Sequence, residues 1–337
     1  MTRAADPRSC PVTMALGVAR DCYGLPAVSG ALLGGGATAN IVVAIADRCR
    51  RRRWVARCHR RDGRTARARF LAAFTAAARE RGLPLPEVIE NLDGAAVTVA
   101  HDAIWVITRY MRGRPYSGGQ ARRDAAGRML ARLHARTAEL PVTGPVGYDQ
   151  RWDAWLQVPE ETLAAARDAA GASAWHLLDP YLPHLGVLHA RPPLAGDLPQ
   201  AWTHGDFHGA NLRMRGNRIT AVLDIDTLDR RPRIYDVAYS ALMLTRRGPG
   251  DYRLPSGGVT SFLAAYAGMA SGLSASELDA FWPCMVLSQL PDIGHLRALR
   301  EAGHPVTGAL RRPMAALEAL SGQHHLLTPA HLLEHRC

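Results

Sequence analysis

Residues 203–226 read THGDFHGANLRMRGNRITAVLDID, and the rest of the chain can be placed around this stretch. It sets one carboxylate, Asp206, between two histidines and places an asparagine, Asn211, five residues later. A Gly-Asn pair then joins two strand-like runs, which is typical of a β-hairpin. Two carboxylates, Asp224 and Asp226, close the second run. The order therefore predicts a polar loop, a hairpin and a second acidic group.

The register of this hairpin determines which polar groups meet. If Arg215 pairs with Arg218 across the turn, antiparallel register places Leu212 opposite Ala221. The residue before Leu212 then lies at the open end of the hairpin, beside the end of the strand that carries Asp224. We therefore expect two oxygen-bearing side chains, thirteen residues apart in sequence, to converge.

The chemistry of these side chains is that of phosphoryl transfer. An amide oxygen from Asn211 and a carboxylate from Asp224 are hard ligands, suited to Mg²⁺ held together with phosphate oxygens. Asp206 lies in the loop just before the hairpin, close enough to accept a proton from an incoming hydroxyl. Protein kinases use the same order: a catalytic-loop aspartate, an asparagine five residues on, and a second aspartate after a short hairpin.

Three segments in sequence order resemble one family. His204–Asn211 is similar to the HGDxHxxN signature of aminoglycoside phosphotransferases and their relatives, which include choline kinases, methylthioribose kinase and type II homoserine kinases. Leu223–Asp226 resembles the metal segment of that family, and Arg233–Ala238 resembles the helix start that follows it. The resemblance implies an ATP-dependent kinase that uses Mg²⁺.

The resemblance also implies roles for individual residues. Asp206 would orient the acceptor hydroxyl and take its proton. Asn211 and Asp224 would hold Mg²⁺, and Asp226, two residues on, can assist. The two histidines of the loop are interpreted as scaffolding, and Asp236 as a structural group that caps backbone or orients the loop.

The nucleotide side of the sequence is less conventional. Gly34, Gly35 and Gly36 precede a strand-like run and can lay backbone N–H groups over phosphates, although a plain hairpin turn is the alternative. Arg57 stands where kinases carry a phosphate-binding lysine, and it is either that phosphate contact or a surface strand arginine. By the same resemblance, the glutamate that usually holds this cation falls on or near Arg67. Backbone groups from Ile107 to Tyr110 would meet adenine.

These segments predict an α+β, bilobal, protein-kinase-like fold. A small β-rich N-lobe, residues 1–112, would bind the nucleotide, and a larger, mainly helical C-lobe, residues 113–337, would carry the catalytic and acceptor-binding groups. A length of 337 residues leaves room for two such lobes.

Composition bounds the other possibilities. The net charge is +11 and all 41 basic residues are arginine, which raises nucleic-acid binding as a class. The arginines are spread along the chain without a nucleic-acid-binding motif, so a solvated surface is favoured. DNA binding whose affinity falls steeply with salt concentration would instead support a nucleic-acid-binding protein. Six scattered cysteines without metal-ligand spacing predict free thiols in a reducing cytoplasm. No signal peptide or membrane span is expected.

The function that follows is ATP-dependent transfer of the γ-phosphate to a hydroxyl of a small molecule. The acceptor would be an antibiotic of the aminoglycoside or nucleoside type, or an amino-alcohol or sugar metabolite, with a role in resistance or secondary metabolism. A homoserine-type metabolite kinase and a kinase-fold binding protein without turnover are the alternatives. We expect no nucleic-acid or membrane partner, and a monomer or homodimer.

Overall fold

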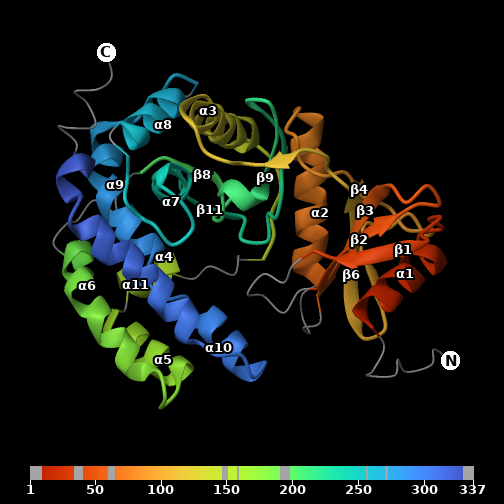
Figure 1. The fold of residues 1–337 in the computed structure, drawn as a ribbon, viewed down its shortest axis with the longest axis horizontal. Helices are drawn as coiled ribbons and strands as arrows, with labels where there is room; N and C mark the ends of the chain where they lie inside the picture. The colour runs from red at the N-terminus through yellow and green to blue at the C-terminus, as the bar shows by residue number, and fades with distance from the viewer. Residues whose placement is uncertain are drawn as a thin grey trace. The chain divides into compact units, whose positions relative to one another are not determined.

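The computed structural model describes residues 10–33, 41–59, 65–145, 151–157, 159–189, 198–255, 257–269 and 272–328. The chain forms two compact units (Figure 1). Unit 1 comprises residues 1–112 and 140–145, and unit 2 comprises residues 113–139 and 146–337. Unit 1 is built on an antiparallel sheet and unit 2 is mainly helical, which confirms the predicted α+β, bilobal, protein-kinase-like class. Within the described ranges, every helix is too short or too polar to cross a bilayer.

Unit 1 contains a six-stranded antiparallel sheet. Its main path runs β1-β2-β3-β6-β4, and β5 pairs with the remaining length of β6. Apolar β-branched runs such as Ile41–Ala46 form its central strands because both of their faces are covered. The strands are β1 (Ser29–Leu32), β2 (Ile41–Ala46), β3 (Arg52–His59), β4 (Val88–Ile89), β5 (Thr98–Ala100) and β6 (Ala103–Arg109).

Two helices cover the two faces of this sheet. Helix α1 (Pro11–Asp21) buries Ala15, Val18 and Ala19, a spacing that lines one helix face, against the sheet face that carries Trp54. Helix α2 (Thr65–Glu80) contributes Ala68 to a smaller cluster on the opposite face. The glycine triplet predicted to cover phosphate, residues 34–36, lies outside the described residues.

Unit 2 combines two small sheets with helices. The sheets have the orders β10-β9-β7 and β11-β8. The strands are β7 (Arg114–Pro115), β8 (Gln200–Thr203), β9 (Leu212–Arg215), β10 (Arg218–Val222) and β11 (Asp229–Pro232). The α-helices are α3 (Gln120–Thr137), α4 (Arg151–Gln157), α5 (Pro159–Ala170), α6 (Leu182–His189), α7 (Arg233–Thr245), α8 (Gly258–Ala267), α9 (Ala275–Ser288), α10 (Ile293–Glu301) and α11 (Thr307–Ser321). The 3₁₀ turns are η1 (Trp175–Tyr181), η3 (Gly209–Asn211) and η4 (His324–Leu327).

Helix α7 is central to unit 2, and Figure 1 shows it among α3, α8, α9 and the β8–β11 pair. Arg233, at its first turn, donates both Nε and Nη2 to the buried carboxylate of Glu277 at 2.7 and 2.9 Å. Burial alone would raise the pKa of Glu277, but the hydrogen bonds from Arg233 and from the Ser274 backbone outweigh it and lower that pKa. Glu277 also forms the capping box of α9 with Ser274, so one carboxylate fixes the starts of two helices.

The hairpin of β9 and β10 has the predicted turn but not the predicted register. Arg218 pairs with Arg215 as expected. A β-bulge between Ile219 and Ala221 then shifts the ladder, so that Leu212 pairs with Val222 and the prediction of Ala221 was wrong. The extra residue is Thr220, whose hydroxyl donates to Arg213 O at 3.1 Å. A bulge adds one unpaired residue to one strand, and sequence spacing alone does not show it.

Candidate active site

The loop after β8 rests on one buried carboxylate, that of Asp236. Its Oδ2 accepts the backbone N–H of His204 at 2.7 Å, and its Oδ1 accepts the backbone N–H of Gly205 at 3.0 Å. Asp236 lies in the first turn of α7 and is fully buried. A buried carboxylate is tolerated where donors satisfy it, so α7 fixes the loop through backbone groups that any sequence would offer.

A third donor comes from α3. His134 Nε2 lies 3.1 Å from Asp236 Oδ2, and His134 Nδ1 lies 2.9 Å from the hydroxyl of Tyr266 on α8. Because a carboxylate oxygen only accepts, Nε2 carries the hydrogen and Nδ1 accepts from the tyrosine in the neutral ring. Burial raises the pKa of Tyr266, which keeps its hydroxyl a donor. Three helices are thus joined below the loop.

The side chain of His204 braces the loop from within. Its Nδ1 accepts the backbone N–H of Asp206 at 3.2 Å, so its Nε2 carries the hydrogen and donates to Leu223 O at 2.9 Å. Phe207, which is fully buried, packs edge-on against the His204 ring with centroids 5.7 Å apart. His204 therefore ties the loop to the end of the hairpin, in the scaffolding position that its sequence predicts.

The carboxylate of Asp206 accepts two side-chain hydrogen bonds and lies close to a third polar group. Tyr239 donates its hydroxyl to Oδ1 at 2.6 Å. Asn211 Nδ2 and His208 Nε2 approach Oδ2 at 3.0 and 3.3 Å. His208 Nδ1 accepts the backbone N–H of Ala210, so Nε2 is the protonated nitrogen. The side chain of Asp206 remains 35% exposed, which leaves it accessible to a substrate.

The structure brings Asn211 next to the residue before Asp224. Leu223 N–H donates to Asn211 O at 2.8 Å, one position beyond the paired end of the hairpin. Asn211 Nδ2 also donates to Asp206 O at 3.0 Å, so the amide oxygen is the atom of this side chain that suits a cation. Asp224 has φ +61°, in the left-handed region that aspartate tolerates better than most residues. Asp226 follows at a turn and is half-buried.

This donor set fits a hard divalent cation bound with phosphate. Among the described residues, no group of three or more His, Cys, Asp or Glu side chains is arranged to hold a metal. Mg²⁺ does not require such a cage, because it is usually bound by one or two carboxylates, waters and substrate phosphates. The amide oxygen of Asn211 with the carboxylate of Asp224 would meet that requirement.

The backbone conformation and close packing of Gly205 predict that adding a side chain there destabilises the protein. Its φ is +73°, and an added Cβ would lie 2.9 Å from Thr227 O; Thr227 itself is fixed because its hydroxyl donates to His204 O at 2.7 Å. We expect Gly205→Ala to lower the free energy of unfolding by about 2–4 kcal/mol, from the left-handed backbone and the overlap together. The matched control is Gly216→Ala, with φ +61° and open space around the Cβ, which should cost only about 1–2 kcal/mol. Equal losses in chemical denaturation would contradict the packing argument.

The residues predicted for the nucleotide side lie in unit 1. Arg57 is on β3, paired with Val106, and shares the sheet face that α2 covers. Arg67 is on α2, buried, and donates Nη1 to Pro145 O at 2.9 Å. Ile107 is buried in the middle of β6, while Tyr110 N–H donates to Arg53 O at 2.8 Å. Any adenine contact at Tyr110 would therefore use a group other than this N–H.

Two contacts of the site were missed from the sequence. Tyr239 lies 33 residues from Asp206 in the sequence, and His134 lies 102 residues from Asp236. The available signal was the spacing of Asp236 and Tyr239, three residues apart, because such residues share a helix face. A helix fixed by Asp236 to the loop presents Tyr239 to the same loop.

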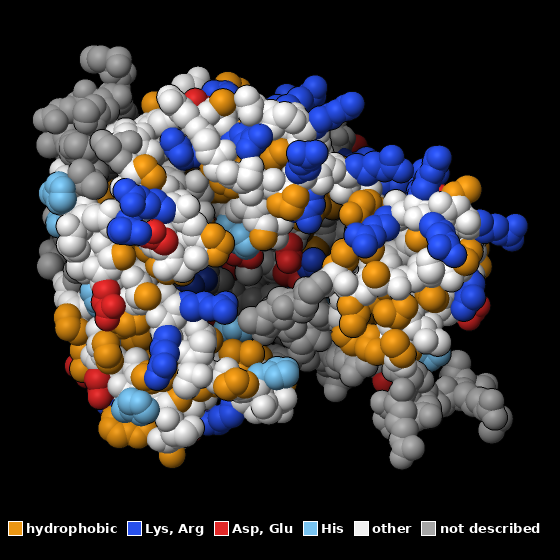
Figure 2. Space-filling view, viewed as in Figure 1, with side chains coloured by type: hydrophobic (Ala, Val, Ile, Leu, Met, Phe, Trp, Pro, Cys, Tyr) orange, Lys and Arg blue, Asp and Glu red, His pale blue; other side chains and the backbone are white. Residues whose placement is uncertain are grey.

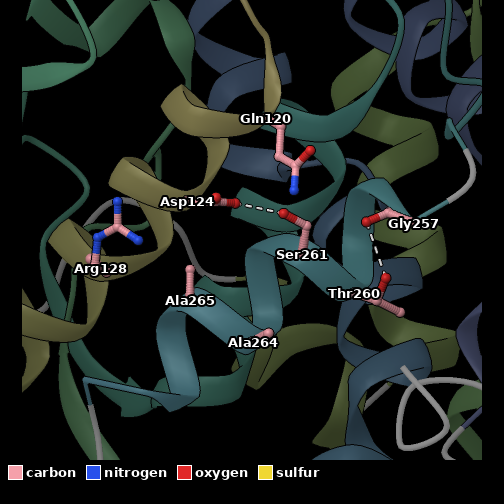
Figure 3. Close-up of a pocket in the computed structure, with 8 residues that line it drawn as sticks. All are labelled: Gln120, Asp124, Arg128, Gly257, Thr260, Ser261, Ala264 and Ala265. Carbon is pink, nitrogen blue, oxygen red and sulfur yellow. Dashed lines mark hydrogen bonds between the residues drawn. The ribbon is translucent and has the colours of Figure 1, made fainter. Parts of the chain in front are cut away.

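A separate depression of about 380 Å³ lies between α3 and α8 in unit 2 (Figure 3). Ser261 donates to Asp124 Oδ1 at 2.5 Å, and Thr260 donates to Gly257 O at 3.0 Å. Two pairs of its polar groups thus bond to each other, and the residues that line it include none predicted for transfer. We assign it no part in the reaction.

Arginine side chains are spread over the visible face of both units (Figure 2).

Comparison with known proteins agrees with the order of these groups. The pattern of a family described as the phosphotransferase enzyme family matches residues 30–271. The chain therefore belongs to the phosphotransferase enzyme family. It is therefore a phosphotransferase, the class of enzyme that the loop and hairpin motifs predict. No curated protein is similar enough in sequence to count as a match.

Solved structures share the fold across nearly the whole chain. A microcompartment-associated aminopropanol kinase is 22% identical, with 94% of this chain and 99% of that chain covered and a TM-score of 0.67. An amicoumacin kinase, solved with AMP-PNP, Ca²⁺ and Ami, is 14% identical, with 95% and 96% covered and a TM-score of 0.65. An aminoglycoside phosphotransferase from Alicyclobacillus acidocaldarius subsp. acidocaldarius is 15% identical, with 98% and 97% covered and a TM-score of 0.63.

Proposed function

We propose that this enzyme transfers the γ-phosphoryl group of ATP to a small-molecule hydroxyl, with Asp206 as the group that takes the proton. One observation carries the proposal most. Asn211 bonds the Asp206 side chain at 3.0 Å and, through its backbone, the strand end that leads into Asp224. The proposed proton acceptor, Asp206, is thus linked through Asn211 to the strand end that leads into the proposed cation ligand Asp224.

The residues of the chain act mainly by positioning. Asp206 would hold the acceptor hydroxyl in line with the γ-phosphorus. As the acceptor oxygen bonds to phosphorus, the bond from phosphorus to the bridging oxygen of ADP breaks, and the hydroxyl proton passes to Asp206. Phosphoryl transfer has a loose transition state, in which positioning and charge neutralisation supply most of the catalysis. The rigid support from Asp236 and His204 serves this task.

Asn211 and Asp224 would hold Mg²⁺, with Asp226 as a further carboxylate. When bound, the ion would neutralise the charge of the phosphate oxygens. In unit 1, Arg57 would contact the phosphates, Gly34–Gly36 would cover them, and the stretch from Ile107 to Tyr110 would meet the adenine.

Asp224→Asn tests the cation site without disturbing the backbone. Asparagine also tolerates the left-handed region that Asp224 occupies, so the change removes charge and keeps shape. We expect the Mg²⁺ concentration that gives half-maximal turnover to rise by about 10- to 100-fold or more, because even partners of metal ligands have effects of that size. The check is a Mg²⁺ titration of ATP turnover, with thermal unfolding as the control for folding. An unchanged Mg²⁺ requirement would remove Asp224 from the site.

The acceptor that we propose is an amino alcohol, a sugar or an antibiotic hydroxyl. Proteins of this fold include an aminopropanol kinase, an amicoumacin kinase, a spectinomycin phosphotransferase and a choline kinase. A homoserine-type metabolite is the alternative acceptor. Asp229 and Asp292, which can be considered as contacts for a cationic acceptor, already have structural bonds to Arg231 and to His295 N–H.

A screen of hydroxylated compounds tests the proposal. The panel would contain aminopropanol, choline, homoserine, spectinomycin and macrolides, each incubated with ATP and Mg²⁺, and the readout is a mass gain of one phosphoryl group. The same panel with Asp206→Asn is the control. Product that forms equally with the variant would argue against Asp206, and a panel without product or ATP turnover would argue against phosphoryl transfer.

A binding protein without turnover is the second candidate. By the family resemblance, Arg57 would stand in place of the usual phosphate-binding lysine, and the position of its glutamate partner falls on or near Arg67. Arg67 donates a hydrogen bond to Pro145 O. An arginine at this position cannot form the ion pair that a glutamate would form with a phosphate-binding cation. Nucleotide binding by calorimetry, together with absence of ATP hydrolysis and transfer, would favour this candidate.

A further inference from the structure

We infer that Tyr239 is a positioning residue, which aims the Asp206 carboxylate so that one lone pair of Oδ1 receives the acceptor hydroxyl. This inference rests on the proposed function of Asp206. It assigns a role to a side chain outside the loop and outside the hairpin, on α7.

The hydrogen bonds of Asp206 leave little freedom. An ionised carboxylate accepts in about two directions on each oxygen. Oδ2 accepts from Asn211 Nδ2 at 3.0 Å, and His208 Nε2 lies 3.3 Å from the same oxygen. Oδ1 faces the Tyr239 hydroxyl at 2.6 Å. Because Oδ2 is bonded to Asn211 and crowded by His208, we infer that the open direction is on Oδ1, beside the tyrosine hydroxyl, and that the acceptor hydroxyl docks there.

Tyr239 is held where this bond requires it. It lies three residues after Asp236, on the same face of α7, and Asp236 is bonded to the backbone of His204 and Gly205 in the same loop. Burial raises the pKa of Tyr239 well above its usual value, and the negative charge of Asp206 raises it further. The hydroxyl is thus a permanent donor and does not compete as a base.

The bond bears on the chemical step itself. During transfer the acceptor oxygen bonds to the γ-phosphorus, the phosphorus–oxygen bond to ADP breaks, and the proton moves to Oδ1. With the Tyr239 hydroxyl on that oxygen, the carboxylate plane is fixed on both sides. Without it, the plane can turn and Oδ1 offers two docking directions, so fewer encounters are productive. Misplacement on the scale of an ångström costs about 100-fold in rate.

Tyr239→Phe is the test, with ATP and Mg²⁺ as substrates and water as the acceptor. We expect kcat for hydrolysis to fall by about 10- to 100-fold while KM for ATP stays within about twofold. The matched control is Tyr181→Phe, which also removes one buried tyrosine hydroxyl bond, to Leu310 O at 2.5 Å, and should leave kcat and KM unchanged. A Tyr239→Phe enzyme with unaltered kcat overturns the inference.

A second measurement does not depend on turnover. The free energy of unfolding is compared for Tyr239→Phe, Asp206→Ala and the double variant, because groups in contact are coupled in such a cycle. Additive effects would show that the two side chains do not bond, and would overturn the inference. If the wild-type protein neither hydrolyses ATP nor transfers phosphate, the proposed function and the inference are both wrong. If the wild type is active and Tyr239→Phe leaves kcat unchanged, only the inference is wrong.

Discussion

Replacing Asp206 with asparagine is expected to lower kcat by about 10²- to 10⁴-fold, the usual contribution of a positioned proton acceptor. The amide keeps the shape of the side chain. Its oxygen can accept from Asn211 at the Oδ2 position, and its nitrogen can donate to the Tyr239 hydroxyl oxygen. The loop is therefore preserved and the ability to take a proton is lost. KM for ATP should change little, because removing a group that acts only in the chemical step leaves ground-state binding intact.

The measurement is steady-state turnover together with ATP–Mg²⁺ binding by calorimetry. Asp279→Asn is the matched control, since Asp279 is an exposed carboxylate on α9, and it should behave as the wild type does. A variant at Asp206 that kept a near-normal kcat would falsify its assignment as the proton acceptor. A variant that lost ATP binding as well would show that the loop, and not only the chemistry, depends on the charge.

Replacing Asp236 with alanine is expected to cause the largest loss of stability. Two backbone N–H groups and His134 Nε2 converge on its carboxylate in a fully buried position. Removing one partner of a buried charged network costs about 3–5 kcal/mol, because each abandoned donor carries a desolvation penalty. For a unit of this size that is a fall in Tm of roughly 6–20 °C. Turnover should fall too, since the loop that carries Asp206 loses its support.

Thermal and chemical unfolding check this expectation, and Asp279→Ala is the control. That exposed side chain should change stability by less than about 0.5 kcal/mol. Asp236→Asn adds a sharper comparison, because the amide offers one oxygen where the carboxylate offers two. It should fall between wild type and Asp236→Ala. A neutral result for Asp236→Ala would mean that water or a neighbouring group replaces the carboxylate.

The sequence predicts the fold class and the helix and strand content well where patterns are local. The spacing of Phe70, Leu71, Phe74 and Ala77 predicts a helix over residues 66–81, and α2 spans Thr65–Glu80. The short run from Trp54 to Arg57 reads as a strand, and it lies within β3. The Gly-Asn turn is also present, with Arg215 opposite Arg218. These features depend on residues close in sequence, whose own preferences decide the outcome.

The prediction fails or stops where distant residues decide the geometry. The bulge at Thr220 moves Leu212 opposite Val222, and it brings Asn211 one position nearer to Asp224 than the expected register. The roles of Arg57 and Arg67 depend on what surrounds them, and the tie from Arg67 to Pro145 O spans 78 residues. Strand register and helix packing are tertiary properties, so spacing along the chain does not determine them.

By itself, then, the sequence from Thr203 to Asp226 determined the reaction class. Asp206, Asn211 and Asp224 are joined by one loop and one hairpin, and short-range backbone geometry is enough to bring them near each other. The tertiary structure decided how Asp206 is held. Asp236 and Tyr239 come from α7 and bond the loop directly, while His134 comes from α3 and bonds Asp236. Only packed helices can bring these groups within about 3 Å of their partners. A buried polar group must be satisfied by whatever the fold brings to it, and that choice is made in three dimensions.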